Sequence, residues 1–221
     1  MYRNGPRRRI SRRNILWGMG GGGVAAGLAA CGTQPAPTAP PKVNPVVMII
    51  RHGEKPPDQG VSPKGIDVDG NENDHALTPT GWVRAGALAH LFGSGGALPQ
   101  GLSVPTQFYA SQGDTKSLRP MQTLSPLAAR VGSYVITKYS RDDVKPLAAE
   151  LRARGGISLI AWESDALPTI PAALGPVDPA PPAVWPNDRF DVIWVLTANG
   201  NGWTFSQVPQ MLLAGDRPNV I

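Results

Sequence analysis

Apolar positions along the chain gather into short blocks that alternate with amphipathic stretches. Residues 46–50 form an unbroken apolar run, and residues 157–162 form a second run that only Ser158 interrupts. Runs of this length are typical of strands that are buried on both faces of a parallel sheet. Between them, residues 78–92 repeat apolar side chains at helical spacing behind Thr78, a favourable N-cap residue. The pattern therefore predicts strands that alternate with helices.

The remaining segments extend the same alternation. We expect further strands at 107–111, 134–139, 189–197 and 203–208, and further helices that begin at 117 and span 141–154. The last two strands flank Asn199-Gly200, a pair of residues typical of a β-hairpin turn. Strands connected by helices predict an α/β fold, a three-layer α/β/α sandwich around a mostly parallel central sheet, over residues 46–221.

A polar loop at residues 56–76 interrupts this alternation and carries a cluster of acidic residues. Asp67 and Asp69 have the spacing of a calcium-binding loop. However, Glu72 stands where such a loop needs glycine, and no helix is expected to precede it. A solvated lid over the end of the first strand is the preferred interpretation, and no metal site is expected.

The first 45 residues predict a targeting segment followed by a linker. Residues 11–16, Ser-Arg-Arg-Asn-Ile-Leu, resemble a twin-arginine export signal, and residues 28–32, Leu-Ala-Ala-Cys-Gly, resemble a bacterial lipobox. The resemblance implies that residues 1–31 are a signal peptide and that a lipid on Cys31 anchors an exported protein to the outer face of a membrane, periplasmic or extracellular. Residues 32–45, rich in proline, alanine and threonine, predict an extended linker. The alternative is a basic arm beside a chance Ala-Ala-Cys.

The net charge of +5 comes from this leader. Six of the 21 basic residues are arginines within residues 1–31, so 15 basic residues face all 16 acidic ones in the rest of the chain. A nearly balanced charge gives no support for binding to nucleic acid. Because Cys31 is the only cysteine, an exported domain would depend on its hydrophobic core and not on disulfides.

Polar residues with catalytic potential follow the first predicted strand directly. Arg51, His52, Gly53 and Glu54 stand where the carboxyl ends of strands bind ligands in open α/β sheets. Arginine supplies a fixed cation, and histidine supplies a nitrogen nucleophile that is largely neutral at physiological pH. On these residues alone, a polar strand end with a capped histidine is an equal alternative. Arg-His-Gly-Glu after an apolar strand resembles the signature of the histidine phosphatase superfamily, which implies a phosphoglycerate mutase-like fold and a transient phosphoryl group on His52.

A second match to this superfamily follows the predicted strand at 107–111. Ser111 ends that strand, and Arg119-Pro120-Met121-Gln122-Thr123 begins the next helix. In the superfamily, an Arg-x-x-Gln-Thr segment follows a strand that ends in serine, and its arginine binds phosphate. The resemblance therefore implies that Arg119 binds phosphate, which the N-terminus of a helix also favours. Taken alone, a salt-bridged surface arginine would be the simpler interpretation. Residues 77–81, Leu-Thr-Pro-Thr-Gly, also resemble the start of the first helix in this superfamily.

The third expected motif departs from the superfamily. Related bacterial proteins have Trp-Glu-His, two residues, an aliphatic residue and proline here, whereas residues 162–168 read Trp-Glu-Ser-Asp-Ala-Leu-Pro. Ser164 thus replaces a second histidine that contacts the phosphoryl oxygens. Loss of one such donor costs on the order of 10²–10³ in rate. Of the other two histidines, His75 is the more plausible substitute and His90 the less plausible one.

Two functional hypotheses follow. The first is a phosphatase that needs no cofactor, in which His52 is the nucleophile. Its phosphate-binding residues would be Arg51, Lys55, Arg119 and Ser164, and its leaving-group acid would be Glu54, Glu163 or Asp165. The second is a non-catalytic lipoprotein that uses the same pocket to bind a phosphorylated small molecule or a phosphoprotein. The intact arginines and His52 favour the first hypothesis, and Ser164 favours the second.

Overall fold

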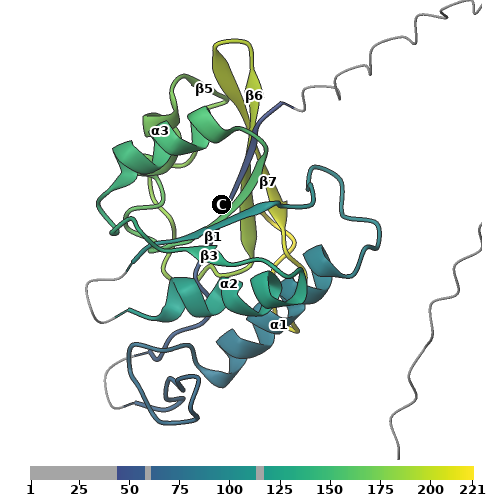
Figure 1. Cartoon of the computed structure of the whole chain (residues 1–221). Coiled ribbons are helices and arrows are strands. Elements are labelled where there is room, and N and C mark those ends of the chain that lie inside the picture. The colour runs from purple at the N-terminus through teal and green to yellow at the C-terminus, as the bar shows by residue number, and fades with distance from the viewer. Residues whose placement is uncertain (1–43, 58–60, 113–116) are drawn as a thin grey trace, which may run out of the picture. The chain divides into compact units, whose positions relative to one another are not determined.

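The computed structural model describes residues 44–57, 61–112 and 117–221, which all belong to one compact unit of the chain. These residues form one seven-stranded sheet and four helices (Figure 1). In chain order the elements are β1 (Val46–Arg51), α1 (Pro79–Gly93), β2 (Gln107–Ala110), α2 (Arg119–Arg130), β3 (Val135–Ile136), α3 (Val144–Arg154), β4 (Ile157–Trp162), α4 (Thr169–Leu174), β5 (Val177–Asp178), β6 (Val192–Asn199) and β7 (Gly202–Pro209).

The first predicted strand lies at the centre of the sheet. The strand order is β3-β2-β4-β1-β6-β7-β5, and β1 pairs in parallel with β4 and in antiparallel orientation with β6. Four of the six pairs of neighbouring strands are parallel, and the β1–β6 and β6–β7 pairs are antiparallel. The expectation of an α/β fold with a mostly parallel sheet is confirmed.

The sheet separates two hydrophobic cores, which gives the expected three layers (Figure 1). Val47 and Ile49 of β1 belong to the core beneath α3 and α4, whereas Met48 and Ile50 belong to the core beneath α1 and α2. All four side chains are fully or almost fully buried. A strand covered by helices on both faces needs an apolar residue at every position, and this explains the unbroken run in the sequence.

β3 is shorter than the sequence pattern predicts. It covers only Val135–Ile136, whereas a strand is predicted over 134–139. Tyr139 donates a hydrogen bond to Glu150 of α3, and Lys138 forms an ion pair with the same carboxylate at 2.5 Å. These contacts with α3 hold the end of the segment, where pairing beside β2 is reduced to an isolated bridge between Gln112 and Ser140.

Three other features depart from the predicted pattern. The predicted start of α3 at residue 141 is wrong, because the Asp143 carboxylate accepts from the backbone N–H and the hydroxyl of Ser140 in a turn that precedes the helix. α4 and β5 are not predicted, since elements this short establish no periodic pattern. The β6–β7 hairpin is present, but β6 begins at Val192 and not at residue 189. Asn199 pairs with Gly202, so the turn lies one residue later than Asn199-Gly200.

The described part of the polar loop, residues 61–76, packs against α1. The Trp82 indole N–H donates to Ile66 O at 2.8 Å. One carboxylate oxygen of Asp67 accepts from the backbone N–H groups of Asp69 and Asn71, so it stabilises a turn within the loop. In the part of the chain that the structure describes, no group of three or more His, Cys, Asp or Glu side chains is placed to hold a metal ion.

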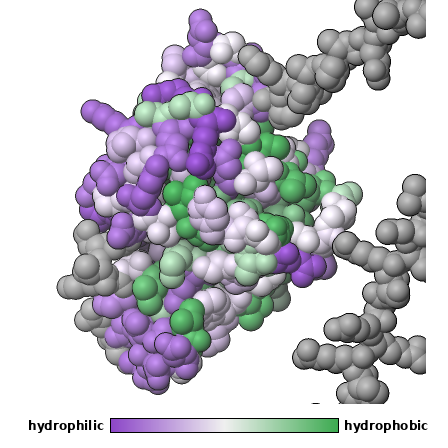
Figure 2. Space-filling model, viewed as in Figure 1, coloured by the Kyte–Doolittle hydropathy of each residue, from purple (hydrophilic) through white to green (hydrophobic). Residues whose placement is uncertain are grey.

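Hydrophilic residues cover much of the surface that Figure 2 shows, and apolar residues gather toward its middle. Among the described residues, no helix combines the length and the apolar character that crossing a membrane requires. The expected signal peptide with Cys31, and all of the expected linker except residues 44–45, lie outside the described residues.

Candidate active site

Three adjacent strands bring the candidate residues to one edge of the sheet. β2, β4 and β1 are neighbours and run in parallel, so their carboxyl ends meet at this edge. Arg51 ends β1 and His52 follows it, Glu163 follows β4, and Ser111 follows β2. The backbone N–H of His52 donates to Trp162 O at 3.1 Å, which extends the contact between β1 and β4 as far as the candidate nucleophile.

The His52 imidazole is almost completely buried and has a defined tautomer. Its Nδ1 lies 2.7 Å from Gly53 O. Because a carbonyl oxygen only accepts, Nδ1 carries the proton in this contact and Nε2 keeps its lone pair. Burial, and then the positive charge of Arg119, lower the pKa of His52 from 6.5 to about 3. The imidazole is therefore neutral at physiological pH, with Nε2 available as a nucleophile.

Arg51 is buried, and its nearest partners are an aromatic ring and backbone carbonyls. Its guanidinium lies 4.1 Å from the centroid of the Phe190 ring, and Nη1 donates to Asn187 O at 2.6 Å. No carboxylate within the described residues forms an ion pair with it. Burial, and then repulsion by Arg119, lower the pKa of Arg51 to about 10. The side chain stays charged at physiological pH, and the carboxylates of Asp188, Asp165 and Glu54 act on it only from beyond ion-pair distance.

Arg119 supplies a second cation at the first residue of α2. Its Nη1 donates to Asp74 O at 3.2 Å, and no described carboxylate pairs with it. Burial lowers the pKa of Arg119, and the charge of Glu163 opposes that effect. A buried guanidinium group, a half-buried one and the N-terminus of a helix thus create a positive potential that favours an anion.

Four buried donors in this region have no partner among the described residues. They are Arg51 Nε, Arg119 Nε, Ser117 Oγ and Gln122 Nε2. A buried donor without an acceptor costs about 1–3 kcal/mol, so a cluster of them indicates a ligand rich in acceptor oxygens. Phosphate and similar oxyanions have this chemistry. The sequence carries no signal for Ser117, because a serine before a helix is usually only a cap.

Thr123 connects α2 to the turn after β1. Its hydroxyl donates to Arg119 O at 2.8 Å and accepts from the Gly53 N–H at 2.8 Å. Gln122 Oε1 accepts in the same way from the Leu77 N–H at 2.8 Å. Gln122 and Thr123 therefore fix the position of Arg119 relative to His52. The sequence analysis assigns no such positioning role to these two residues.

Replacing Thr123 with valine should lower the free energy of unfolding by about 1–3 kcal/mol. Valine keeps the shape of threonine but leaves the buried Gly53 N–H without an acceptor. Urea unfolding followed by tryptophan fluorescence measures the change. Ser125→Ala is the matched control, because Ser125 also donates to a carbonyl of α2, Met121 O, but from an exposed position. Equal losses in the two variants would contradict the positioning role.

Glu54, one of the candidate acids, belongs to a buried ion-pair network. Its Oε1 accepts from Arg84 Nη2 at 2.7 Å, and Arg84 also pairs with Asp216 at 2.7 Å. The first turn of α1 packs closely on this segment, since an added Cβ at Gly81 would lie 2.6 Å from Glu54 O. The sequence analysis does not identify Arg84. Its position next to Ala85, on the apolar side of α1, could have indicated a buried charge that needs a partner.

Glu163 has the environment that a proton donor needs. The Ser111 hydroxyl donates to Glu163 Oε2 at 2.5 Å. Burial raises the pKa of Glu163, and the hydrogen bond from Ser111 and the charge of Arg119 oppose this only in part. A raised pKa keeps the carboxyl group protonated over a wider range of pH, as general acid catalysis requires.

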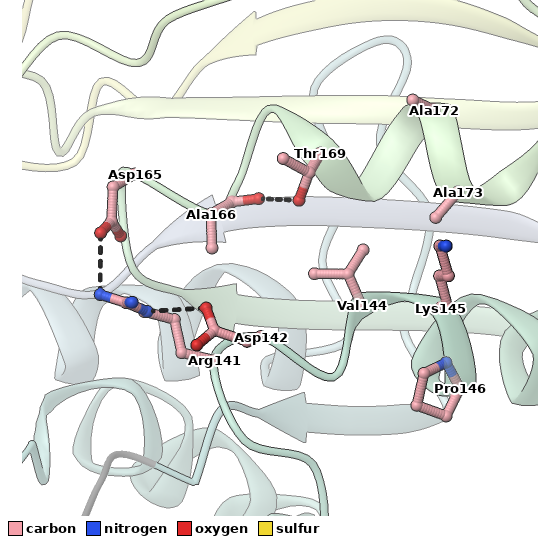
Figure 3. Close-up of a pocket in the computed structure, with 10 residues that line it drawn as sticks. All are labelled: Arg141, Asp142, Val144, Lys145, Pro146, Asp165, Ala166, Thr169, Ala172 and Ala173. Carbon is pink, nitrogen blue, oxygen red and sulfur yellow. Dashed lines mark hydrogen bonds and ion pairs between the residues drawn. The ribbon is translucent and has the colours of Figure 1, made fainter.

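The two residues that follow Glu163 lie nearer to solvent. Asp165 is exposed and forms an ion pair with Arg141 at 2.9 Å (Figure 3). Ser164 is half-buried and lines a small cavity together with Asp165 and Asn187. Because Asn187 O is also the acceptor for Arg51, Ser164 lies on the same side of the site as that guanidinium.

The remaining predicted residues have lesser contacts with this site. Lys55 is exposed, and its positive charge is a minor contribution to the lowered pKa of His52. His75 is half-buried, and its carbonyl accepts from the Leu118 N–H, so its backbone lies beside the start of α2. His90 is exposed, as the helical pattern predicts.

A larger groove between α3 and α4 does not contain the nucleophile. It has a volume of about 800 Å³, and its lining includes Val144, Pro146 and Ala172 but neither His52 nor Arg119 (Figure 3). The volume of a groove does not by itself indicate a reaction. The buried donors without partners indicate that the candidate active site lies at the edge of the sheet.

No protein-family model matches the chain, and no curated protein matches it. Similar solved structures include the protein histidine phosphatase SixA complexed with tungstate, at 19% identity and a TM-score of 0.49, covering 75% of this chain and 97% of that chain. A putative alpha-ribazole-5'-P phosphatase from Escherichia coli is similar at 15% identity and a TM-score of 0.45, covering 78% and 100%. A phosphoserine phosphatase mutant from Entamoeba histolytica in complex with phosphoserine is similar at 12% identity and a TM-score of 0.44, covering 73% and 94%. A likeness this distant assigns neither a family nor an activity.

Proposed function

We propose that this chain is a member of the histidine phosphatase superfamily, with a phosphoglycerate mutase-like fold, and that it hydrolyses a phosphomonoester through a phosphohistidine at His52. The observation that carries the proposal is a buried, neutral His52 whose Nε2 keeps its lone pair near two guanidinium groups, neither of which pairs with a carboxylate of the described residues. A structural histidine at a strand end needs no such neighbours. The Arg-His-Gly-Glu and Arg-x-x-Gln-Thr segments and their place at the carboxyl ends of parallel strands support the same function.

The proposed reaction has two steps. His52 Nε2 attacks the phosphorus and forms a P–N bond, while the ester P–O bond breaks and the leaving oxygen takes a proton from a carboxylic acid. Water then attacks the phosphorus, the P–N bond returns its electron pair to Nε2, and the carboxylate takes the proton of the water. Arg51 and Arg119 hold the phosphoryl oxygens and neutralise their charge in both steps.

Glu163 is the proposed proton donor. Burial raises the pKa of Glu163, and its carboxylate is in hydrogen-bond contact with Ser111, which follows β2. Glu54 is held by Arg84, and Asp165 is held by Arg141 at the surface. A carboxylate in an ion pair is a poor source of a proton.

Glu163→Gln should reduce kcat for an alkyl phosphate by about 10²–10⁴, because the alkoxide then leaves without a proton. The effect on p-nitrophenyl phosphate should be much smaller, since its leaving group needs no proton. Glutamine keeps an acceptor oxygen for Ser111, so the fold should be retained. Asp165→Asn is the matched control; if that variant shows the selective loss, the role belongs to Asp165.

The pH profile of kcat/KM gives a second readout of the same assignment. Activity should fall on the acid side as His52 is protonated near its pKa of about 3. It should fall on the alkaline side as pH rises through the raised pKa of Glu163, because the acid is then lost. The alkaline fall should disappear in Glu163→Gln.

Ser164 makes this a slow enzyme in our proposal. Its hydroxyl offers one neutral hydrogen bond where a protonated imidazole would add positive charge. The lost transition-state stabilisation is about 3–4 kcal/mol. His75, whose backbone lies beside the start of α2, is the alternative source of the second imidazole.

A non-catalytic binding protein is the second candidate function, and Ser164 is the observation that favours it. In this case Arg51 and Arg119 would bind a phosphorylated small molecule or a phosphoprotein. The discriminating experiment compares aryl phosphate hydrolysis by the natural chain and by His52→Ala. Hydrolysis that depends on His52 supports the phosphatase, and phosphate binding without such hydrolysis supports the binding protein.

We also propose that the protein is exported and anchored to a membrane by a lipid on Cys31. The support is the order of the twin arginines, the apolar segment and the lipobox within residues 1–31. Cys31→Ala should keep its leader or lose its lipid, and Arg12→Lys with Arg13→Lys should block export. Mass spectrometry and cell fractionation test both outcomes. An unmodified Cys31 behind an intact Met1 leader would contradict the proposal.

A further inference from the structure

A small cavity opens beside Ser164 and has mainly apolar walls. Its volume is about 240 Å³. Pro168, Val184 and Trp185 form much of its lining, and three polar residues complete it: Ser164, Asp165 and Asn187. Serine is a small residue, so its side chain leaves this space open. The volume lies just below the roughly 300–1,000 Å³ of sites for drug-sized ligands, so the cavity suits one small group.

Two of these polar residues connect the cavity to the phosphate-binding residues. Asn187 O accepts from Arg51 Nη1 at 2.6 Å, and Ser164 directly follows the proposed acid Glu163. A phosphomonoester held by Arg51 and Arg119 therefore has this opening beside it.

The apolar wall is rigid on one side and open on the other. Trp185 is 3% exposed, its indole N–H donates to Arg189 O at 2.9 Å, and its ring lies 4.8 Å from the ring of Trp194. Val184 next to it is 71% exposed. Trp185 is already buried, so it keeps this wall rigid and has little surface left to cover. The exposed Val184 side chain gains stability from an apolar group that covers it.

The polar cavity near the same site is a weaker candidate for the organic group. It has a volume of about 390 Å³ and is lined by Glu54, Arg84 and Asp216. These side chains already pair with one another, with both Arg84 contacts at 2.7 Å. The one buried atom of these three side chains without a partner among the described residues is Glu54 Oε2, an acceptor that would repel an anionic substituent.

We propose that the cavity beside Ser164 binds the leaving group of the substrate, and that the preferred substrate is the phosphomonoester of a small apolar, ring-bearing alcohol or phenol. This inference rests on the proposed function, because it names the substrate class of the same site. In this proposal Val184 determines specificity, because its side chain contacts the organic group and not the phosphoryl group.

Calorimetry with inorganic phosphate, methylphosphonate and phenylphosphonate on the full chain tests the inference. Phosphonates are not hydrolysed, so affinity is measured without any influence of leaving-group acidity on rate. Phenylphosphonate should bind about tenfold more tightly than methylphosphonate, because its ring is buried in the cavity. Val184→Asn should weaken the binding of phenylphosphonate about three- to tenfold and leave the affinity for methylphosphonate unchanged. The matched control is Val104→Asn, at an exposed valine in the loop before β2, and it should change neither affinity.

The outcomes separate this inference from the proposed function. If phosphate and both phosphonates bind, but the two phosphonates bind equally well, the apolar cavity takes no part and the inference is overturned while the anion site stands. If Val184→Asn weakens both phosphonates equally, the inference is also overturned. If none of the three anions binds, the anion site and the inference fail together.

Discussion

Ser164→His should raise the turnover of an aryl phosphate by about one to three orders of magnitude. The position directly follows Glu163 and lines a cavity that also contains Asn187, the residue whose carbonyl holds Arg51. A side chain larger than serine therefore has space to extend beside the phosphate-binding residues. A protonated imidazole there would donate a hydrogen bond and positive charge to the phosphoryl oxygens during transfer.

The gain should appear in kcat, measured at saturating substrate. KM should rise for substrates with a bulky organic group, since the imidazole takes space in the cavity beside position 164. The gain should vanish when Ser164→His is combined with His52→Ala, because the new histidine assists the nucleophile and does not replace it. A folded Ser164→His variant that binds phosphate without any turnover would instead favour the binding-protein function. If the natural chain is already fast and His75→Ala abolishes its activity, the loop supplies the second imidazole.

Removing the Arg119 guanidinium should weaken phosphate binding by about 10- to 100-fold, since a charge-assisted hydrogen bond is worth about 1.5–3 kcal/mol. It should also lower kcat by about 10²–10³, because a preorganised donor to the transition state is lost. Arg119→Ala leaves α2 anchored through Thr123, so the loss reports the missing charge. Calorimetry with inorganic phosphate and steady-state kinetics measure the two effects.

Arg152→Ala is the matched control for this variant. Arg152 also donates to backbone carbonyls, Ala173 O at 2.7 Å and Leu174 O at 3.2 Å, but it is exposed on α3. Phosphate affinity should be unchanged in that variant. Equal affinities of Arg119→Ala and Arg152→Ala for phosphate would remove Arg119 from the site and leave little support for a phosphatase.

The parts of the fold that follow from local patterns are predictable from the sequence. The apolar run of β1 requires burial on both faces, and the two cores provide it. Thr78 caps α1 as expected, with its hydroxyl accepting from the Gly81 N–H. Arg51 and His52 lie at the carboxyl end of β1 because they directly follow the apolar run. The short elements α4 and β5 contain too few residues for a period to be recognised.

The parts of the site that depend on distant partners are not predictable in this way. The raised pKa of Glu163 depends on its burial and on Ser111, which belongs to another strand. Arg84 is understandable only once Asp216 is placed beside it by the fold. The choice of Glu163 among three acids, and the apolar cavity beside Ser164, therefore required three-dimensional contacts.

The most direct test of the central claim is to trap the phosphorylated intermediate. Rapid mixing of the full chain with an aryl phosphate, quenching in alkali, and mass spectrometry of the peptides should find one phosphoryl group on His52. The modification should be stable in base, labile in acid, and absent from His52→Ala. Accumulation should be favoured by the charges of Arg51 and Arg119, which we propose bind the transferred group. Steady hydrolysis of the aryl phosphate with His52 unmodified, or with the phosphoryl group on another residue, would contradict the proposed function.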